Sequence, residues 1–157
     1  MALISPELQQ QVLASAVVFT DEQVREAWTK GPLAHLQLIS TNKKYRALPM
    51  EQWEAILDLH LSIRPYVPEF FDCDSFAAAL MGMVAYDFEI NGIARVLDTS
   101  GEHSYNAVLV RTPSGNKCLW GRVEPQADRF LKDLPRTVHI TGPDSHYPAT
   151  EGFAVTA

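Results

Sequence analysis

The sequence feature that most constrains the fold is a change of hydrophobic period at Asn91-Gly92. Before this turn dipeptide, apolar residues recur three and four positions apart, as on one face of an α-helix. After it, three segments have the residue pattern of β-strands: 93–97, 104–110 and 117–123. The turn formers at 112–116 predict a hairpin between the last two. Helices followed by antiparallel strands predict an α+β fold with a helix resting on a sheet.

The helical half predicts four helices. Ser5 is a good N-cap and Pro6 suits the first position of a helix. A second helix starts at Thr20 and ends before Gly31. We expect these two to form an accessory helical hairpin within 1–40. The third helix follows Pro49 and stops before Pro65, and the central helix runs from Asp74 to near Asp87.

The chain of 157 residues predicts a single domain over 1–157, with its core at 45–130. A further strand is expected at 137–140. The residues from 142 to 157 contain several turn formers and little periodicity, which predicts a loosely ordered surface tail.

Composition excludes several classes of function. The net charge of −6 argues against a nucleic-acid partner, because neutralising phosphates requires a basic patch. No apolar run is long enough to span a membrane, and the N-terminus lacks the basic start of a signal peptide. Two cysteines form no disulfide framework, although a bridge between them stays open. We therefore expect a cytoplasmic protein with reduced thiols.

Cys73 is the first candidate for chemistry. Asp72 is well placed to cap the central helix, which puts Cys73 in its first turn. The partial positive charge of a helix N-terminus favours the nucleophilic thiolate, and its free N–H groups can bind an oxyanion. The carboxylates of Asp72 and Asp74 oppose this effect by raising the thiol pKa. A nucleophilic role for the sulfur therefore requires an imidazolium partner.

His103 and Glu124 are the candidates for that partnership. His103 stands where a glycine turn enters a strand, and Glu124 stands at the end of the next strand. The midpoint of positions 103 and 124 falls between 113 and 114, among the turn formers of the hairpin. An antiparallel hairpin centred there brings the two side chains together. A carboxylate beside an imidazole can fix its tautomer and orientation.

Each of these residues also has a purely structural interpretation. A single cysteine is commonly a small buried hydrophobe, a histidine near a turn is commonly a surface residue, and a Glu-Pro pair commonly ends a strand. Asp98, Asp72 and Asp74 can cap helices and turns, or contribute oxygen ligands to a cation.

Four short motifs in order carry a resemblance to a known family. They are Tyr45-x-x-Leu48-Pro49-x-Glu51-x-Trp53, Phe71-Asp72-Cys73-Asp74-x-Phe76-Ala77, Asp98-x-Ser100-Gly101-x-His103-x-Tyr105-Asn106 and Glu124-Pro125-Gln126. The set resembles the papain-like C-terminal domain of the Marasmius oreades type of fungal agglutinin, and related small proteins of phage and bacterial genomes. The match covers roughly residues 45 to 130.

The resemblance implies a papain-like cysteine hydrolase that cleaves an amide bond in a peptide or protein substrate. Cys73 would be the nucleophile, His103 the base and Glu124 the acid that orients the imidazole. The agglutinin domain is a calcium-dependent protease, so Ca²⁺ is the implied cofactor, with Asp74 as a ligand.

The sequence also departs from this family. Val67 stands where papain-like proteases place the glutamine of the oxyanion hole, and Ser75 stands where many relatives carry a second acid. Two alternatives therefore stay open. One is a non-catalytic phage or bacterial structural or interaction protein that retains the fold. The other is a peptidoglycan amidase, since the cysteine and histidine segments also resemble NlpC/P60 peptidases and transglutaminase-like enzymes.

Overall fold

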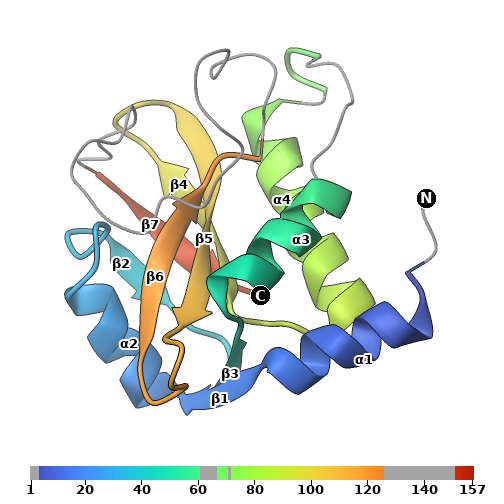
Figure 1. Ribbon diagram of the computed structural model, residues 1–157. Coiled ribbons are helices and arrows are strands. Elements are labelled where there is room, and N and C mark those ends of the chain that lie inside the picture. Colours follow the sequence, from blue (N-terminus) through green and yellow to red (C-terminus); the bar gives the residue numbers. More distant parts are fainter. Residues whose placement is uncertain (1–3, 61–66, 71, 126–150) are drawn as a thin grey trace.

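The structure is a computed structural model that describes residues 4–60, 67–70, 72–125 and 151–157. Figure 1 shows helices on both sides of a twisted sheet. Within the described ranges the elements follow in the order α1 (Pro6–Ser15), β1 (Val17–Thr20), α2 (Asp21–Thr29), β2 (Gln37–Ile39), β3 (Lys44–Ala47), α3 (Met50–His60), α4 (Cys73–Phe88), β4 (Ile93–Asp98), β5 (His103–Arg111), β6 (Cys118–Val123) and β7 (Gly152–Thr156).

The main sheet has five strands in the order β2-β7-β4-β5-β6. β2 and β7 are parallel, and the other neighbouring pairs are antiparallel. The predicted hairpin is β5–β6, in which Arg111 pairs with Cys118. β1 and β3 form a separate antiparallel pair beside the main sheet. The α+β class expected from the sequence is confirmed.

The core divides into two apolar clusters, one on each face of the main sheet. α2 packs against β6 and contributes Val24 and Trp28 to the first cluster. α3 and α4 pack against the other face, where Trp53 and Leu80 belong to the second cluster. Figure 1 shows α2 on one side of the sheet and α3 and α4 on the other. The sheet is therefore covered on both faces.

The three tryptophans hold elements together through their indole N–H groups as well as their rings. Trp28, Trp53 and Trp120 are buried and donate hydrogen bonds to backbone carbonyls of Leu36, Leu109 and Val24 respectively. A buried indole N–H left unpaired costs free energy, so these contacts satisfy a requirement of burial. They tie α3 to β5 and α2 to β6.

The predicted helical hairpin within 1–40 is wrong. β1 separates the two helices; α1 contacts α4, whereas α2 contacts β6 on the opposite face of the sheet. The Val17-Val18-Phe19-Thr20 run is rich in β-branched and aromatic side chains, which favour an extended backbone. Its pairing with β3 prevents the chain from turning directly back on itself.

The predicted surface tail is also wrong for its last residues. β7 lies between β2 and β4 and pairs with both. Its residues alternate between the faces, and Ala154 and Thr156 are buried. The hydroxyl of Thr156 is within hydrogen-bond distance of those of Tyr45 and Thr41, which fixes the strand's end beside β3. The strand expected at 137–140 lies outside the described residues.

A search for membrane-spanning segments gives no candidate, since none of the helices among the described residues is both long and apolar enough to cross a bilayer.

Two glycines give a matched test of the packing. A Cβ atom added to Gly92 would lie 2.2 Å from the backbone oxygen of Arg46, whereas one added to Gly82, on the exposed side of α4, would meet nothing within 4 Å. We expect Gly92→Ala to lower the free energy of unfolding by about 3 kcal/mol, because backbone must move. Gly82→Ala should raise it by about 0.5–1 kcal/mol through helix propensity. Urea denaturation measures both, and an unchanged stability of Gly92→Ala would contradict the close approach.

Candidate functional site

A buried hydrogen bond between a histidine and a glutamate lies where β5 begins and β6 ends. The His103 Nε2 atom is 2.7 Å from the Glu124 Oε2 atom, and the exposed fractions of the two side chains are 6% and 7%. A carboxylate can only accept, so the imidazole donates this hydrogen bond. The hairpin register explains the approach: Asn106 pairs with Val123, which sets Glu124 opposite the start of β5. The structure thus brings together two of the three residues named from the sequence.

Aromatic and acidic neighbours hold the imidazole in place. The ring of His103 stacks on that of Tyr105, two residues along β5, with centroids 5.8 Å apart and planes at 25°. Burial raises the pKa of Tyr105 to about 12, and the nearby charges of Asp98 and Glu124 add to this, while Arg122 opposes it. The phenol is therefore neutral at physiological pH, and its ring stacks on the imidazole.

The turn from β4 into β5 is organised by Asp98. Its Oδ1 atom accepts hydrogen bonds from the backbone N–H groups of Ser100 and Gly101 and from the Ser100 hydroxyl. A Cβ atom at position 101 would lie 2.7 Å from the Asp98 carboxylate, so the turn needs a glycine there. Glu102 has a left-handed backbone with φ 51°, an uncommon conformation that sets the direction in which His103 enters the sheet.

Cys73 opens α4 at the same end of the sheet. Asp72 occupies the N-cap position as expected, but its side chain makes no capping hydrogen bond. The sulfur is half-buried and hydrogen-bonds to the backbone of Ser104, the residue after His103. Figure 1 shows the start of α4 and the β4–β5 turn at one end of the molecule. All three predicted site residues therefore gather in one region.

The surroundings of Cys73 favour its neutral thiol. Burial raises the pKa of the Cys73 thiol, and the charges of Asp74 and Asp72 raise it further. Hydrogen bonds with the backbone of Ser104 and of Asp74 lower the pKa, but not enough to reverse the direction. A raised pKa means that the thiol is protonated at neutral pH, and a protonated thiol is a weak nucleophile.

An exposed aromatic residue beside this region was not singled out from the sequence. Phe70, three residues before Cys73, is 84% exposed although its side chain is apolar. The preceding Glu69 has a left-handed backbone with φ 66°. Strained residues of this kind cluster at functional sites, and an exposed aromatic ring is a common contact for ligands. The only signal in the sequence was an aromatic residue in a loop bounded by Pro68 and the helix.

The calcium ligand expected at Asp74 lies apart from any cluster of potential metal-binding side chains among the described residues. Asp74 is exposed in the first turn of α4, and no cluster of three or more aspartate, glutamate, histidine or cysteine side chains is present within the described part of the chain. Calcium requires six to eight oxygen ligands. Asp98 uses one of its two oxygens within its own turn. The Ca²⁺ ligand role of Asp74 stays a prediction.

Comparisons with known proteins define the fold that surrounds this site. No protein-family model matches the chain, and no curated protein sequence matches it. A solved structure titled "PSL1a-E64 complex" matches with a TM-score of 0.59 and 21% identity over 88% of this chain and 51% of that one. The Polyporus squamosus lectin bound to a human-type influenza-binding epitope, Neu5Aca2-6Galb1-4GlcNAc, matches with a TM-score of 0.56 and 21% identity. That match covers 88% of this chain and 49% of the lectin.

These neighbours show a shared fold, and this chain spans about half the length of each. They fit the predicted resemblance at a coarser level, because they are a fungal lectin related to agglutinins.

The predicted cysteine hydrolase is contradicted. One of the solved structures that share this fold is a lectin bound to a glycan epitope. The predicted peptide or protein substrate is contradicted on the same ground. The physical reason lies in the thiol: the helix N-terminus was expected to favour a thiolate, but burial and the charges of Asp74 and Asp72 raise the pKa of the Cys73 thiol instead.

The state of the thiol gives a direct test. At pH 7.5 we expect iodoacetamide to label Cys73 more slowly than free cysteine, and the rate to rise with pH as the thiolate forms. Asp74→Asn removes a charge that raises the thiol pKa, so it should speed labelling by roughly two- to fivefold. Cys118, whose pKa burial raises to about 11, is the internal reference. Faster labelling of Cys73 than of free cysteine would contradict the neutral thiol.

The buried pair is tested by a stability series. Glu124→Ala leaves the His103 N–H without its acceptor and should lower the free energy of unfolding by about 3 kcal/mol. Glu124→Gln keeps an acceptor oxygen and should cost about 1 kcal/mol. Chemical denaturation with urea at pH 7 measures both. Equal losses for the two variants would show that the hydrogen bond does not contribute to stability.

Proposed function

We propose that this chain is a non-catalytic binding protein with a glycan as its ligand. The observation that carries the proposal is the position of Cys73 at the start of α4 between Asp72 and Asp74, where burial and these two charges raise the thiol pKa and oppose the nucleophilic thiolate. The ligand class is supported by the lectin that shares the fold and whose title names a bound glycan epitope. Cys73, His103 and Glu124 are proposed as the framework of this site.

The side chains around the framework favour a neutral sugar. Phe70 exposes an aromatic ring on which the apolar face of a pyranose can pack. Asp72, Asp74 and Glu102 offer carboxylate oxygens, which accept hydrogen bonds from sugar hydroxyls. The same carboxylates repel an anionic sugar. We therefore assign a neutral, hydroxyl-rich glycan to this site.

The fold itself is proposed to be the papain-like one, of the agglutinin type to which the four sequence motifs point. The order of a cysteine-bearing helix, a histidine-bearing strand and an acid on the next strand supports this assignment. In this proposal the His103–Glu124 hydrogen bond has a structural task, because it ties the start of β5 to the end of β6. The ligand then meets a preformed surface, which lowers the entropic cost of binding.

Binding is tested with a glycan array, followed by calorimetry on the best glycan. We expect the labelled chain to bind neutral glycans above an albumin background and to prefer them to sialylated ones. Phe70→Ala should weaken the best complex by about tenfold or more, as loss of an aromatic anchor does. Tyr86→Ala is the matched control, since Tyr86 is equally exposed at 84% but lies near the other end of α4.

Two results would overturn the proposal. Failure to bind any glycan would show that this chain does not share the ligand class of the lectin, of which it matches about half. Equal losses from Phe70→Ala and Tyr86→Ala would show that the site has been placed at the wrong end of the helix.

A further inference from the structure

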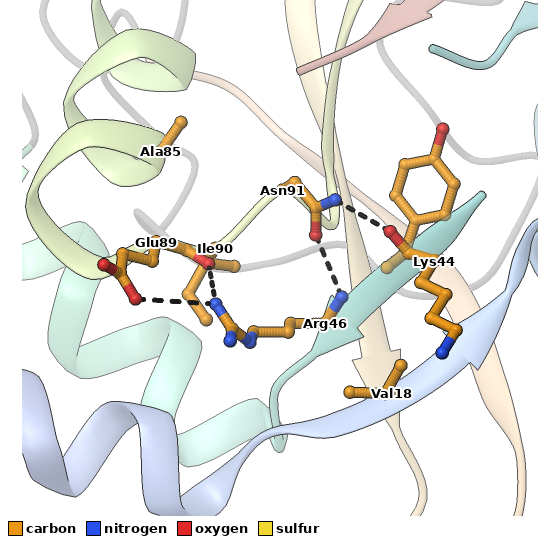
Figure 2. Close-up of a pocket in the computed structure, with 8 residues that line it drawn as sticks. Val18, Lys44, Arg46, Ala85, Glu89, Ile90 and Asn91 are labelled. Carbon is orange, nitrogen blue, oxygen red and sulfur yellow. Dashed lines mark hydrogen bonds and ion pairs between the residues drawn. The ribbon is translucent and has the colours of Figure 1, made fainter. Parts of the chain in front are cut away.

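A hollow lies at the C-terminal end of α4, between that helix, β3 and β1, with a volume of about 400 Å³. Figure 2 shows Arg46 running along its edge beside Glu89 and Ile90. Because α4 has 16 residues and rises about 1.5 Å per residue, this hollow is about 24 Å from Cys73 along the helix axis. It is therefore separate from the site at the start of the helix.

The wall of the hollow is unusually well fixed. Glu89 ends α4 with a left-handed backbone at φ 56°. Asn91 then clamps β3, because its Oδ1 atom accepts from the Arg46 backbone N–H and its Nδ2 atom donates to the Lys44 carbonyl. Gly92 is so close to Arg46 that a Cβ atom has no room. Several local constraints thus hold a short segment against β3, as expected of a preformed binding site.

Two cations border this hollow in a protein of net charge −6. Arg46 donates through Nη1 to the Glu89 carbonyl at 2.9 Å, which fixes the guanidinium. Its remaining N–H groups make no hydrogen bond within the residues that the structure describes. Lys44, on the same side of β3, has no ion-pair partner among the described residues, and its flexible stem lets the ammonium reach the hollow. The Glu89 carboxylate, 3.7 Å from Arg46, offsets part of this positive charge.

The remaining lining is apolar. Val18 is 56% exposed at the hollow, and Ala85 and Ile90 line it from the helix side. A planar guanidinium with free donors matches a carboxylate, and an apolar wall matches a small hydrocarbon body. We propose that this hollow binds a free small organic acid, with its carboxylate on Arg46, near the charge of Lys44, and its apolar part against Val18 and Ala85. This inference does not rest on the proposed glycan function.

The probe is phenylacetate, titrated into the ¹⁵N-labelled full chain and followed by NMR at the Asn91 side-chain amide and the Arg46 backbone amide. We expect saturable shifts at these groups with a Kd on the order of 1 mM, the range for a ligand of this size. Phenylacetamide lacks the charge and acetate lacks the ring, so each should bind at least about fivefold more weakly. Equal binding of phenylacetamide would overturn the carboxylate assignment, and equal binding of acetate would overturn the apolar one.

Charge variants test whether phenylacetate binds in this hollow. Lys44→Gln should weaken phenylacetate binding by about threefold and Arg46→Gln by about tenfold or more. Glu89→Gln should tighten it, because the competing carboxylate is removed. Lys43→Gln removes the same charge as Lys44→Gln from a position that does not line the hollow, and should change the Kd by less than twofold.

The Arg46 contact with Glu89 contributes to the fold, so the exposed Lys44 and Glu89 provide the test if Arg46→Gln does not fold. Unchanged affinity in both Lys44→Gln and Glu89→Gln would overturn the proposal. A short peptide ending in phenylalanine that binds more than tenfold tighter than phenylacetate would show that the occupant is a peptide instead of a free acid.

Discussion

The structure depends above all on β5, which is paired along both edges and covered on both faces. Of its nine residues only Arg111 is not buried. Tyr105 and Leu109 belong to the cluster beneath α2, and Val108 and Val110 to the cluster beneath α3 and α4. A strand in this position has its backbone groups satisfied by its two neighbours and its side chains desolvated on both sides. The histidine at its start therefore has little freedom, and its hydrogen bond to Glu124 forms within a rigid frame.

The ionisation of the Cys73 thiol is a separate matter from the position of Cys73 near the start of β5. A nucleophilic cysteine needs surroundings that stabilise negative charge. Here burial and two aspartates oppose the thiolate, and the backbone hydrogen bonds from Ser104 and Asp74 do not compensate for them. The geometry of a fold and the ionisation of a side chain are separate properties, so a fold known from lectins and a set of residues typical of hydrolases are compatible in one chain.

The helix α4 organises both candidate sites. Its first turn carries Cys73 beside Phe70, and its last turn leads into Glu89 and the hollow against β3. Among the described residues outside glycine, the left-handed backbone positions are Glu69, Glu89 and Glu102, and each borders one of these two sites. Left-handed residues with side chains are uncommon and cost free energy, so their placement at both ends of one helix indicates that these surfaces are maintained by the surrounding structure.

The sequence alone determined the features that depend on neighbours along the chain. Helical periodicity located α4, turn formers located the β5–β6 hairpin, and the spacing around that hairpin predicted that His103 and Glu124 approach each other. Only the tertiary structure decided that β7 enters the middle of the sheet and that α1 and α2 lie on opposite faces. Pairing between short strands that lie far apart in the sequence produces no local periodicity from which it could be predicted. The thiol pKa likewise depends on burial and on charges brought near by folding, which the order of residues does not reveal.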